Sequence, residues 1–521
     1  MQLTQFPNKK SAFVLGLVIF GIFVLPVQIN PDNFMQDDSY FYLQVAHNIV
    51  NQFGSTFNQI TPTNGYHPLW MLFNILGLAL AKSEKSIALH VVFGIQALFF
   101  LGTAICFAKI SELISLRFWI VGLSIISAYF LSTGIFGSEA HLNAFTLIIG
   151  IYFFLAASIS QEPRRWMLSS LFLGLSVLAR LDNIFIVGSI FGIGLLNQYK
   201  YGIRTLINSF IIIILPFSII VAPYLLINLA YYGHLVPISG AIKSSFPILT
   251  ADINNLGTLG KIVAISAILS LVLSLSIKLE KSQSLLLKVL SIGVLLHAGY
   301  VVLFTNHYTF WPWYYVAGVL NIGFVVPIIL KLVDKTVERF FSQRVRNQVV
   351  ILIASFILIG GAFRGWMKAL NPASIGPFDL PWRINNDRWP NEVAIWLKNT
   401  LQPQSGILVY DWPGAIAYYS DLRILPVDGL MNDFQYNDDI LEIGINQYLC
   451  NHNIDFYLGP MSSGEDEYQS VEIPAPLYRK PAGVITLLEK NLVIRIRDIV
   501  RLPEGAPPFA LWRIENSTIC E

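Results

Sequence analysis

Twelve apolar segments dominate this sequence, and most of them are long enough to cross a lipid bilayer as a helix. Of the 521 residues, 54% are hydrophobic and 13% are charged, whereas an average soluble domain is about 25% charged. A transmembrane helix needs roughly 20 apolar residues to span the hydrocarbon core. We therefore expect a polytopic α-helical membrane protein with about 11–13 transmembrane helices. The segments lie at residues 12–29, 67–81, 87–108, 119–136, 140–159, 166–179, 184–196, 206–231, 262–277, 285–305, 310–330 and 348–366.

Basic residues between the segments predict which side of the membrane each loop occupies, because cytoplasmic loops are rich in Lys and Arg. Lys9 and Lys10 precede the first segment, and no small-residue cleavage site follows it, so we expect a retained helix and not a signal peptide. The loop 331–346 carries five Lys and Arg residues and should be cytoplasmic. Residues 1–366 would then form the membrane domain, and 367–521 would lie outside the cytoplasm.

The number of crossings in the first half conflicts with these charges. Lys85 and Lys200 are both expected inside, which requires an even number of crossings between them, yet five apolar segments lie there. We expect that segment 119–136 does not cross fully. The alternative fuses 166–179 and 184–196 into one broken helix, which would leave two arginines outside.

Residues 367–521 have a different composition, with more Pro, Asp and Asn and with short mixed strands. Short β-rich runs that alternate with helical ones favour a small layered α/β domain. A GxGxxG motif is absent, so nucleotide binding is not indicated. Cys450 and Cys520 would pair only if this domain lies in an oxidising compartment. The formal net charge of +2 gives no indication of nucleic-acid binding.

Two adjacent carboxylates, Asp37 and Asp38, begin the predicted first outer loop at residues 30–66. From Tyr42 to Phe53 the apolar positions recur at helical spacing, which predicts an amphipathic helix lying on the membrane surface. One of the acids could simply cap this helix. A pair of like charges is better explained if one acid accepts a proton while the other forms a hydrogen bond or binds a cation. We expect Asp37 to be the base and Asp38 its helper and candidate metal ligand.

Other polar residues stand at the ends of apolar segments. Tyr66 and His67 in "TNGYHPLW" either form an interfacial turn or contact a substrate. Glu139 and His141 in "FGSEAHLN" begin an apolar helix, where ionisable residues indicate a functional site by default.

Three further segments carry charged or aromatic residues. Arg180 and Asp182 in "LARLDNIF" either pair with each other or present the arginine to an anionic group. Lys243 either extends toward lipid headgroups or reaches a lipid-linked phosphate. His307 belongs to an aromatic cluster, "NHYTFWPWYY", which could form an interface belt or stack on a sugar.

The order of these motifs, from "DDSYFYLQVAHNI" through "NGYHPLW", "GSEAHLNAF" and "LARLDNIF" to "YYGHLVP", resembles the GT-C superfamily of polytopic glycosyltransferases. It is most similar to the bacterial branch that includes the mycobacterial arabinofuranosyltransferases and the RgtA/B/C/D-like domains. The resemblance covers roughly residues 12–250, and "YDWPGAIAYYSDLRILPVDGL" resembles the C-terminal domain of that branch. It implies a polyprenyl-phosphate sugar donor and an acid in the first outer loop that acts on the acceptor hydroxyl, which matches Asp37.

The sequence therefore predicts a multi-pass protein of a bacterial inner membrane that moves a hexose or pentose from a polyprenyl-phosphate donor to an extracytoplasmic glycan, lipid or protein acceptor. In-line attack would invert the anomeric centre. The cofactor expectation is none or a divalent cation. The alternative is a transporter or flippase, although the acids cluster at one face and no internal repeat of the transporter type is found.

Overall fold

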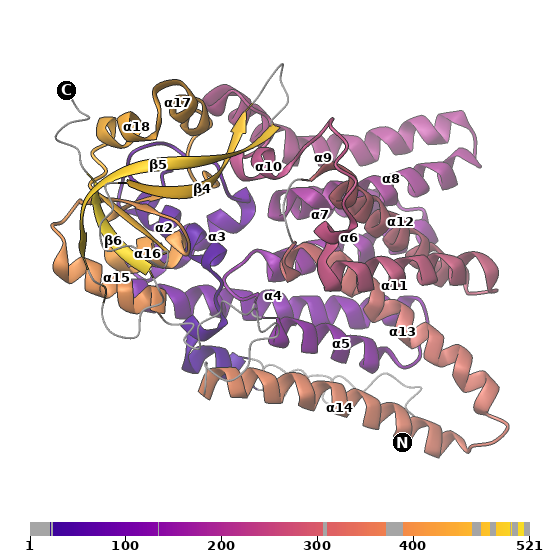
Figure 1. The fold of residues 1–521 in the computed structure, drawn as a ribbon. Coiled ribbons are helices and arrows are strands. Elements are labelled where there is room, and N and C mark those ends of the chain that lie inside the picture. The colour runs from indigo at the N-terminus through magenta and orange to yellow at the C-terminus, as the bar shows by residue number, and fades with distance from the viewer. Residues whose placement is uncertain are drawn as a thin grey trace.

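The computed structural model describes residue 21 and residues 24–133, 135–305, 310–370, 389–460, 470–479, 486–500, 502 and 509–514. Most of the predicted first helix and the candidate site residue His307 lie outside these residues. Helices fill the chain up to residue 370, and the C-terminal part combines helices with a sheet (Figure 1).

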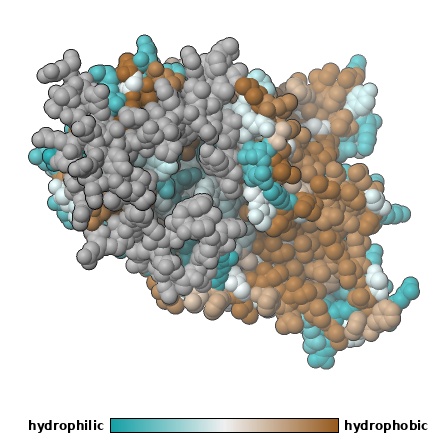
Figure 2. Space-filling view, viewed as in Figure 1, coloured by the Kyte–Doolittle hydropathy of each residue, from teal (hydrophilic) through white to brown (hydrophobic). Residues whose placement is uncertain are grey.

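Eight helical segments of the described residues are long and apolar enough to cross a membrane, which confirms the predicted polytopic helical fold. Only 11% of the most apolar stretch of Ile203–Tyr232 is buried, and Figure 2 shows a broad apolar surface over this part of the molecule. An apolar surface of this size fits a lipid environment. The eight segments are α4 (Lys85–Leu113), α6 (Ala140–Ser160), Leu181–Tyr199 with α8 (Ile184–Tyr199), α9 (Ile203–Tyr232), Ile253–Ser276 with α11 (Gly257–Ser276), α12 (Lys281–Phe304), Pro312–Val337 with α13 (Val316–Val337), and α14 (Gln343–Leu370).

Three shorter helices complete the bundle. They are α3 (Pro68–Leu80), α5 (Trp119–Ser132) and α7 (Pro163–Ala179). Helix α5 packs along α13 and α14, and α7 packs between α6 and α9. One end of the bundle carries a cluster of ion pairs in which the carboxylate of Asp334 binds Arg117 at 2.5 Å and Arg346 at 2.7 Å. This end contains the basic loop for which the sequence predicts a cytoplasmic location.

The C-terminal domain occupies the opposite end of the bundle (Figure 1). Its strands form one sheet in the order β2-β1-β3-β6-β5-β4, in which β1 is parallel to both β2 and β3, while β6 is antiparallel to β3. This mixed sheet is compatible with the predicted α/β domain. Cys450 in α18 is disulfide-bonded, whereas Cys520 lies outside the described residues. The elements are α15 (Trp389–Thr400), β1 (Gly406–Val409), α16 (Pro413–Ser420), β2 (Arg423–Pro426), α17 (Tyr436–Ile443), α18 (Ile445–Asn451), β3 (Phe456–Pro460), β4 (Ser470–Arg479), β5 (Thr486–Val500) and β6 (Phe509–Ile514).

Helix α3 corrects the predicted topology, because its two ends lie at the same end of the bundle. The backbone N–H of its N-cap residue, His67, donates to the Tyr42 hydroxyl. Lys85, just beyond α3, binds Asp421 of the C-terminal domain at 2.5 Å and also the carbonyl of Tyr418. Both ends of α3 therefore lie at the C-terminal-domain end of the bundle. Lys85 therefore lies at the opposite end of the bundle from the basic loop 331–346, whereas the charge rule predicts that both lie on the same side.

Helix α5 provides the second correction. Arg117, which immediately precedes α5, belongs to the ion-pair cluster at the far end, and the Tyr129 hydroxyl near the other end of α5 donates to the carbonyl of Pro312. Segment 119–136 thus runs the length of the bundle, although the crossing count predicted that it would not. Five apolar segments between Lys85 and Lys200 no longer conflict with the positions of the two lysines, because Lys85 and Lys200 then lie at opposite ends of the bundle.

Helix α2 (Asp37–Val50) differs from the predicted surface helix. Residues 39–46 are all buried, because α2 packs against α3 on one side and α16 on the other. One apolar core contains Leu43 of α2, Trp70 of α3 and Ile416 of α16. The apolar stripe of α2 therefore contacts protein on both faces instead of lipid on one, and it joins the C-terminal domain to the bundle.

Candidate active site

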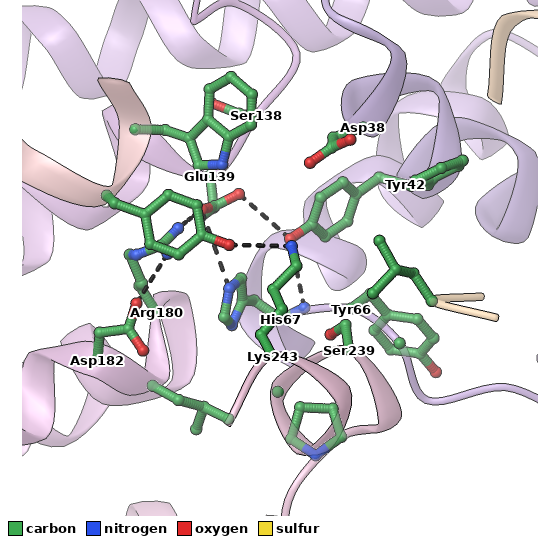
Figure 3. A pocket seen from close by; sticks show the side chains of 18 of the residues that line it. Asp38, Tyr42, Tyr66, His67, Ser138, Glu139, Arg180, Asp182, Ser239 and Lys243 are labelled. Atoms are coloured by element: carbon green, nitrogen blue, oxygen red, sulfur yellow. Dashed lines mark hydrogen bonds and ion pairs between the residues drawn. The ribbon is translucent and has the colours of Figure 1, made fainter. Parts of the chain in front are cut away.

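A pocket of about 110 Å³ lies where α2, the bundle and the C-terminal domain meet (Figure 3). Seven of the ten predicted site residues line it. Asp37 and His141 do not line it, and His307 lies outside the described residues. The seven are Asp38, Tyr66, His67, Glu139, Arg180, Asp182 and Lys243.

The two adjacent acids of α2 point in different directions. Gln36 is extended, and the helix begins at Asp37, so both acids occupy the first turn, where the helix dipole favours carboxylates. The Asp37 carboxylate accepts hydrogen bonds from the backbone N–H groups of Gly414, at 3.1 Å, and Ala415, at 2.8 Å. Asp37 therefore caps α16 and does not face the pocket. The prediction that Asp37 is the base is not supported by this geometry.

Asp38 faces the pocket instead (Figure 3). Among the polar side chains of residues 37–42, it alone makes no hydrogen bond or ion pair within the described residues. Burial raises the pKa of Asp38, and the nearby Lys243 ammonium opposes this increase. Asp38 is thus a carboxylate that is available to a substrate.

Arg180 forms the centre of a buried ion-pair network. Its guanidinium binds Glu139 and, at 2.8 Å, Asp182. The contact with Asp182 is one of the two alternatives that the sequence leaves open. The side chains of Arg180 and Glu139 are only 3% and 2% exposed. The guanidinium also lies over the Tyr314 ring, 3.7 Å from its centroid. Two carboxylates of the protein thus balance the charge of Arg180, while its Nε–H group has no hydrogen-bond partner within the described residues.

Tyr42 and His67 extend this network toward α2. The Tyr42 hydroxyl donates to Glu139 at 3.2 Å and accepts the His67 backbone N–H at 3.4 Å. The His67 Nε2 atom lies 3.9 Å from Glu139. Burial lowers the pKa of His67 to about 4, so the imidazole is neutral at pH 7. Its Nδ1 atom is buried without a hydrogen-bond partner within the described residues.

Lys243, at the end of the short helix α10 (Ile238–Lys243), supplies the second cation of the pocket. Its ammonium hydrogen-bonds the Tyr314 hydroxyl at 3.0 Å, and no carboxylate pairs with it within the described residues. Burial lowers the pKa of Lys243, but Tyr314 and Asp38 more than offset this effect and raise the pKa above its usual value. The ammonium is therefore charged at pH 7 and available to an anion.

His141 corrects another expectation. It is buried between the rings of Phe130 and Phe136, at centroid distances of 4.6 and 4.8 Å, and it lines a small apolar cavity separate from the main pocket. Glu139 and His141 are two positions apart at the start of α6, and such residues point to nearly opposite sides of a helix. The spacing of Glu139 and His141 in the sequence could therefore have shown that the two side chains do not belong to one site.

The C-terminal domain supplies part of the pocket wall through Leu430 and Met431. Gly65 packs directly beneath them, and a Cβ atom at this position would lie 2.3 Å from the Leu430 carbonyl oxygen. The Thr63 hydroxyl donates to the carbonyl of Asn432 at 3.3 Å. The sequence alone did not predict this wall, because "GLMND" carries no motif. Its periodicity also presented Tyr42 only as an apolar position of a helix, although Tyr42 lines the pocket. The complete pocket requires both parts of the chain.

Within the residues that the structure describes, no group of three or more His, Cys, Asp or Glu side chains is arranged to hold a metal ion. Asp38 as a metal ligand stays a prediction.

Comparison with known proteins gives structural matches only. No protein-family model and no curated sequence matches the chain. The chain is similar to ArnT from Cupriavidus metallidurans in the apo state, with a TM-score of 0.59, 10% identity, and coverage of 87% of this chain and 94% of that one. The same protein bound to undecaprenyl phosphate matches with a TM-score of 0.56, 10% identity, and coverage of 87% and 93%.

A third match is the oligosaccharyltransferase of Archaeoglobus fulgidus in complex with Zn and sulfate, with 11% identity, a TM-score of 0.49, and coverage of 92% of this chain and 75% of that one. The similarity to ArnT extends over both the helical bundle and the C-terminal part. It supports the fold that the resemblance implies, and it does not select the arabinofuranosyltransferase branch. This chain therefore has the fold of the GT-C superfamily of membrane glycosyltransferases.

Proposed function

We propose that this chain is an integral membrane glycosyltransferase that moves a sugar from a polyprenyl-phosphate donor to an extracytoplasmic acceptor. The observation that carries the proposal is that one pocket at the end of a membrane-spanning bundle holds the Asp38 carboxylate and the Lys243 ammonium, neither of which has an ion-pair partner within the described residues. A polyprenyl-phosphate donor carries its cleavable bond at the membrane surface, and an ArnT of similar fold binds undecaprenyl phosphate.

The two groups match the two charges that develop during glycosyl transfer. Asp38 accepts the proton of the acceptor hydroxyl while that oxygen forms a bond to the anomeric carbon. The bond between the anomeric carbon and the phosphate oxygen breaks, and its electron pair leaves with the phosphate. Lys243 stabilises the added negative charge on this phosphate. Attack from the side opposite the leaving group inverts the anomeric configuration.

Arg180 has a different role in this scheme. Its charge is already balanced by Glu139 and Asp182, so it orders the floor of the pocket and supports the Tyr314 ring. Tyr314 in turn receives the hydrogen bond that orients Lys243. The network therefore positions the free ammonium before the donor binds, which is the preorganisation that electrostatic catalysis requires.

We expect the pH dependence to report on the electrostatic influence of Lys243 on Asp38. Turnover should rise with pH as the Asp38 carboxyl ionises. The Lys243 ammonium lowers the pKa of Asp38, so Lys243→Met should move this rise to higher pH by about 1 unit and reduce turnover about 10²–10³-fold. The measurement is kcat/KM for the donor across the pH range in which the protein stays folded. Lys261→Met, which removes an exposed contact with Asn254, serves as the control. An unchanged pH profile in Lys243→Met would show that Lys243 does not influence the ionisation of Asp38.

The proposal also places the pocket and the C-terminal domain outside the cytoplasm. The support is the basic loop 331–346 at the opposite end of the bundle. Alkaline phosphatase fused after Glu521 should be active, because it folds only outside the cytoplasm, whereas a fusion within residues 338–342 should be inactive. The reverse pattern of activity would overturn the orientation.

The function itself is tested with a panel of polyprenyl-phosphate sugars that carry hexoses or pentoses. Wild-type protein in nanodiscs, supplied with envelope extract as the acceptor source, should release polyprenyl phosphate from one of these donors. Turnover of none of them would contradict the proposal.

A further inference from the structure

We propose that Asp37 is a positioning residue that fastens the C-terminal domain to the first turn of α2 and thereby holds Asp38 in the pocket. This inference rests on the proposed function of Asp38. It explains why two acids stand side by side: one serves the reaction, and the other connects the domains.

The connection is made through the free N–H groups at the start of α16. The first N–H groups of a helix have no partner within that helix, and the two oxygens of Asp37 each accept one of them, from Gly414 and Ala415. A carboxylate at this position also interacts favourably with the helix dipole. Asp37 is therefore the cap of a helix that lies more than 370 residues later in the chain.

The local sequence of the C-terminal domain is shaped for this contact. A Cβ atom on Gly414 would lie 2.4 Å from the Asp37 backbone carbonyl oxygen and 2.9 Å from its carboxylate. Only glycine permits this approach without displacement of α2. Trp412, immediately before the helix, adopts a left-handed conformation with φ 58°, and Pro413 occupies the first helical position, where proline needs no N–H partner.

The bundle holds the same turn of α2 from the other side. The Ser39 hydroxyl donates to the carbonyl of Phe136 at 3.0 Å. Gly137, with φ +81°, packs so closely that a Cβ atom there would lie 2.6 Å from that of Ser39. Asp38 thus stands between one residue fixed to the C-terminal domain and another fixed to the bundle. Loss of either contact should let the Asp38 carboxylate move.

If Asp37 only helped to dock the C-terminal domain, its removal should mainly lower the stability of the protein. The interface contains other polar contacts, including Lys85 with Asp421 at 2.5 Å and the hydrogen bond that the Tyr419 hydroxyl donates to Asp32. These contacts and the shared apolar core should keep the domain attached when the Asp37 bonds are removed. Removing Asp37 should therefore change the orientation of Asp38 more than it changes overall stability.

The test compares Asp37→Asn and Gly414→Ala, which disturb the contact from opposite sides, with the control Asp421→Asn. Asparagine replaces one of the two carboxylate oxygens by an NH2 donor, so the N–H group that this oxygen accepted loses its acceptor. Each of the two variants should lower kcat for polyprenyl phosphate release about 10–100-fold and leave the KM for the donor within about twofold. The double variant should be no slower than the slower single variant, because both changes remove one contact. Asp421→Asn should retain kcat within about twofold.

A second readout does not depend on turnover. Hydrogen exchange at the amides of Gly414 and Ala415 should be faster in Asp37→Asn than in wild type and unchanged in Asp421→Asn. If wild type releases no polyprenyl phosphate, the proposed function fails while the exchange result still decides whether Asp37 caps α16. Unchanged exchange, wild-type kcat in Asp37→Asn, or an equal loss in Asp421→Asn would each overturn the inference. If Asp37→Asn does not fold, the kinetics and exchange of Gly414→Ala decide the question.

Discussion

Replacing Asp38 by asparagine should lower turnover about 10²–10⁴-fold, which is the usual contribution of a general base. The substitution preserves size but removes the ability to accept the proton of the acceptor hydroxyl. Because Asp38 makes no hydrogen bond or ion pair within the described residues, the fold should tolerate the change. The measurement is polyprenyl phosphate release per mole of folded protein, with folding checked by size-exclusion chromatography and thermal unfolding.

The informative comparison is with the neighbouring acid. Asp37→Asn keeps Asp38 in place as a chemical group and disturbs only its position, so its loss of turnover should be smaller. This order is the reverse of the one that the sequence motif predicts. Wild-type turnover in Asp38→Asn, or a larger loss in Asp37→Asn than in Asp38→Asn, would exclude Asp38 as the base.

Replacing Arg180 by methionine should cause the largest loss of stability, about 3–5 kcal/mol of unfolding free energy. The guanidinium is 3% exposed, and its removal leaves the carboxylates of Glu139 and Asp182 without their counter-charge. A buried charge without a partner is costly, whereas an exposed pair contributes only about 0–1 kcal/mol. The measurement is thermal or denaturant unfolding in detergent.

Arg165→Met is the matched control, since Arg165 pairs with Glu162 at 2.8 Å and the two side chains are 40% and 54% exposed. It should hardly change stability. The double variant Arg180→Met with Glu139→Gln should recover part of the loss, because it removes one of the uncompensated charges. Equal stability of the Arg180 and Arg165 variants would show that the buried network does not stabilise the fold.

Several features could be predicted from sequence because they depend on local composition. Apolar runs indicate the membrane-spanning bundle, and alternating short strands and helices indicate the C-terminal α/β domain. The sequence also allowed the prediction that Glu139, Arg180 and Asp182 lie near one another. All three stand at helix ends, and counting the membrane crossings between them places these ends on one side. The contact between Arg180 and Glu139 agrees with this placement, although the crossing count behind it was wrong for Lys85 and for segment 119–136.

Other features depend on contacts between distant parts of the chain. The choice between Asp37 and Asp38 is made by α16, which begins at Pro413. The location of Lys85 is set by its ion pair with Asp421, which the rule for basic loops does not consider. A 13-residue apolar helix such as α3 resembles a membrane span by composition, although it packs beside α2. Sequence patterns describe each element and leave the partner of its buried face undetermined.

The most direct test of the central claim is the release of polyprenyl phosphate by purified wild-type protein and Asp38→Asn in the same nanodiscs. Mass spectrometry would follow each donor of the panel together with the glycosylated acceptor. Wild type should convert one donor into polyprenyl phosphate with an equal amount of glycosylated product, and Asp38→Asn should leave that donor essentially intact. Intact donors in every wild-type reaction, or equal release by the two proteins, would contradict the proposed glycosyltransferase and its base.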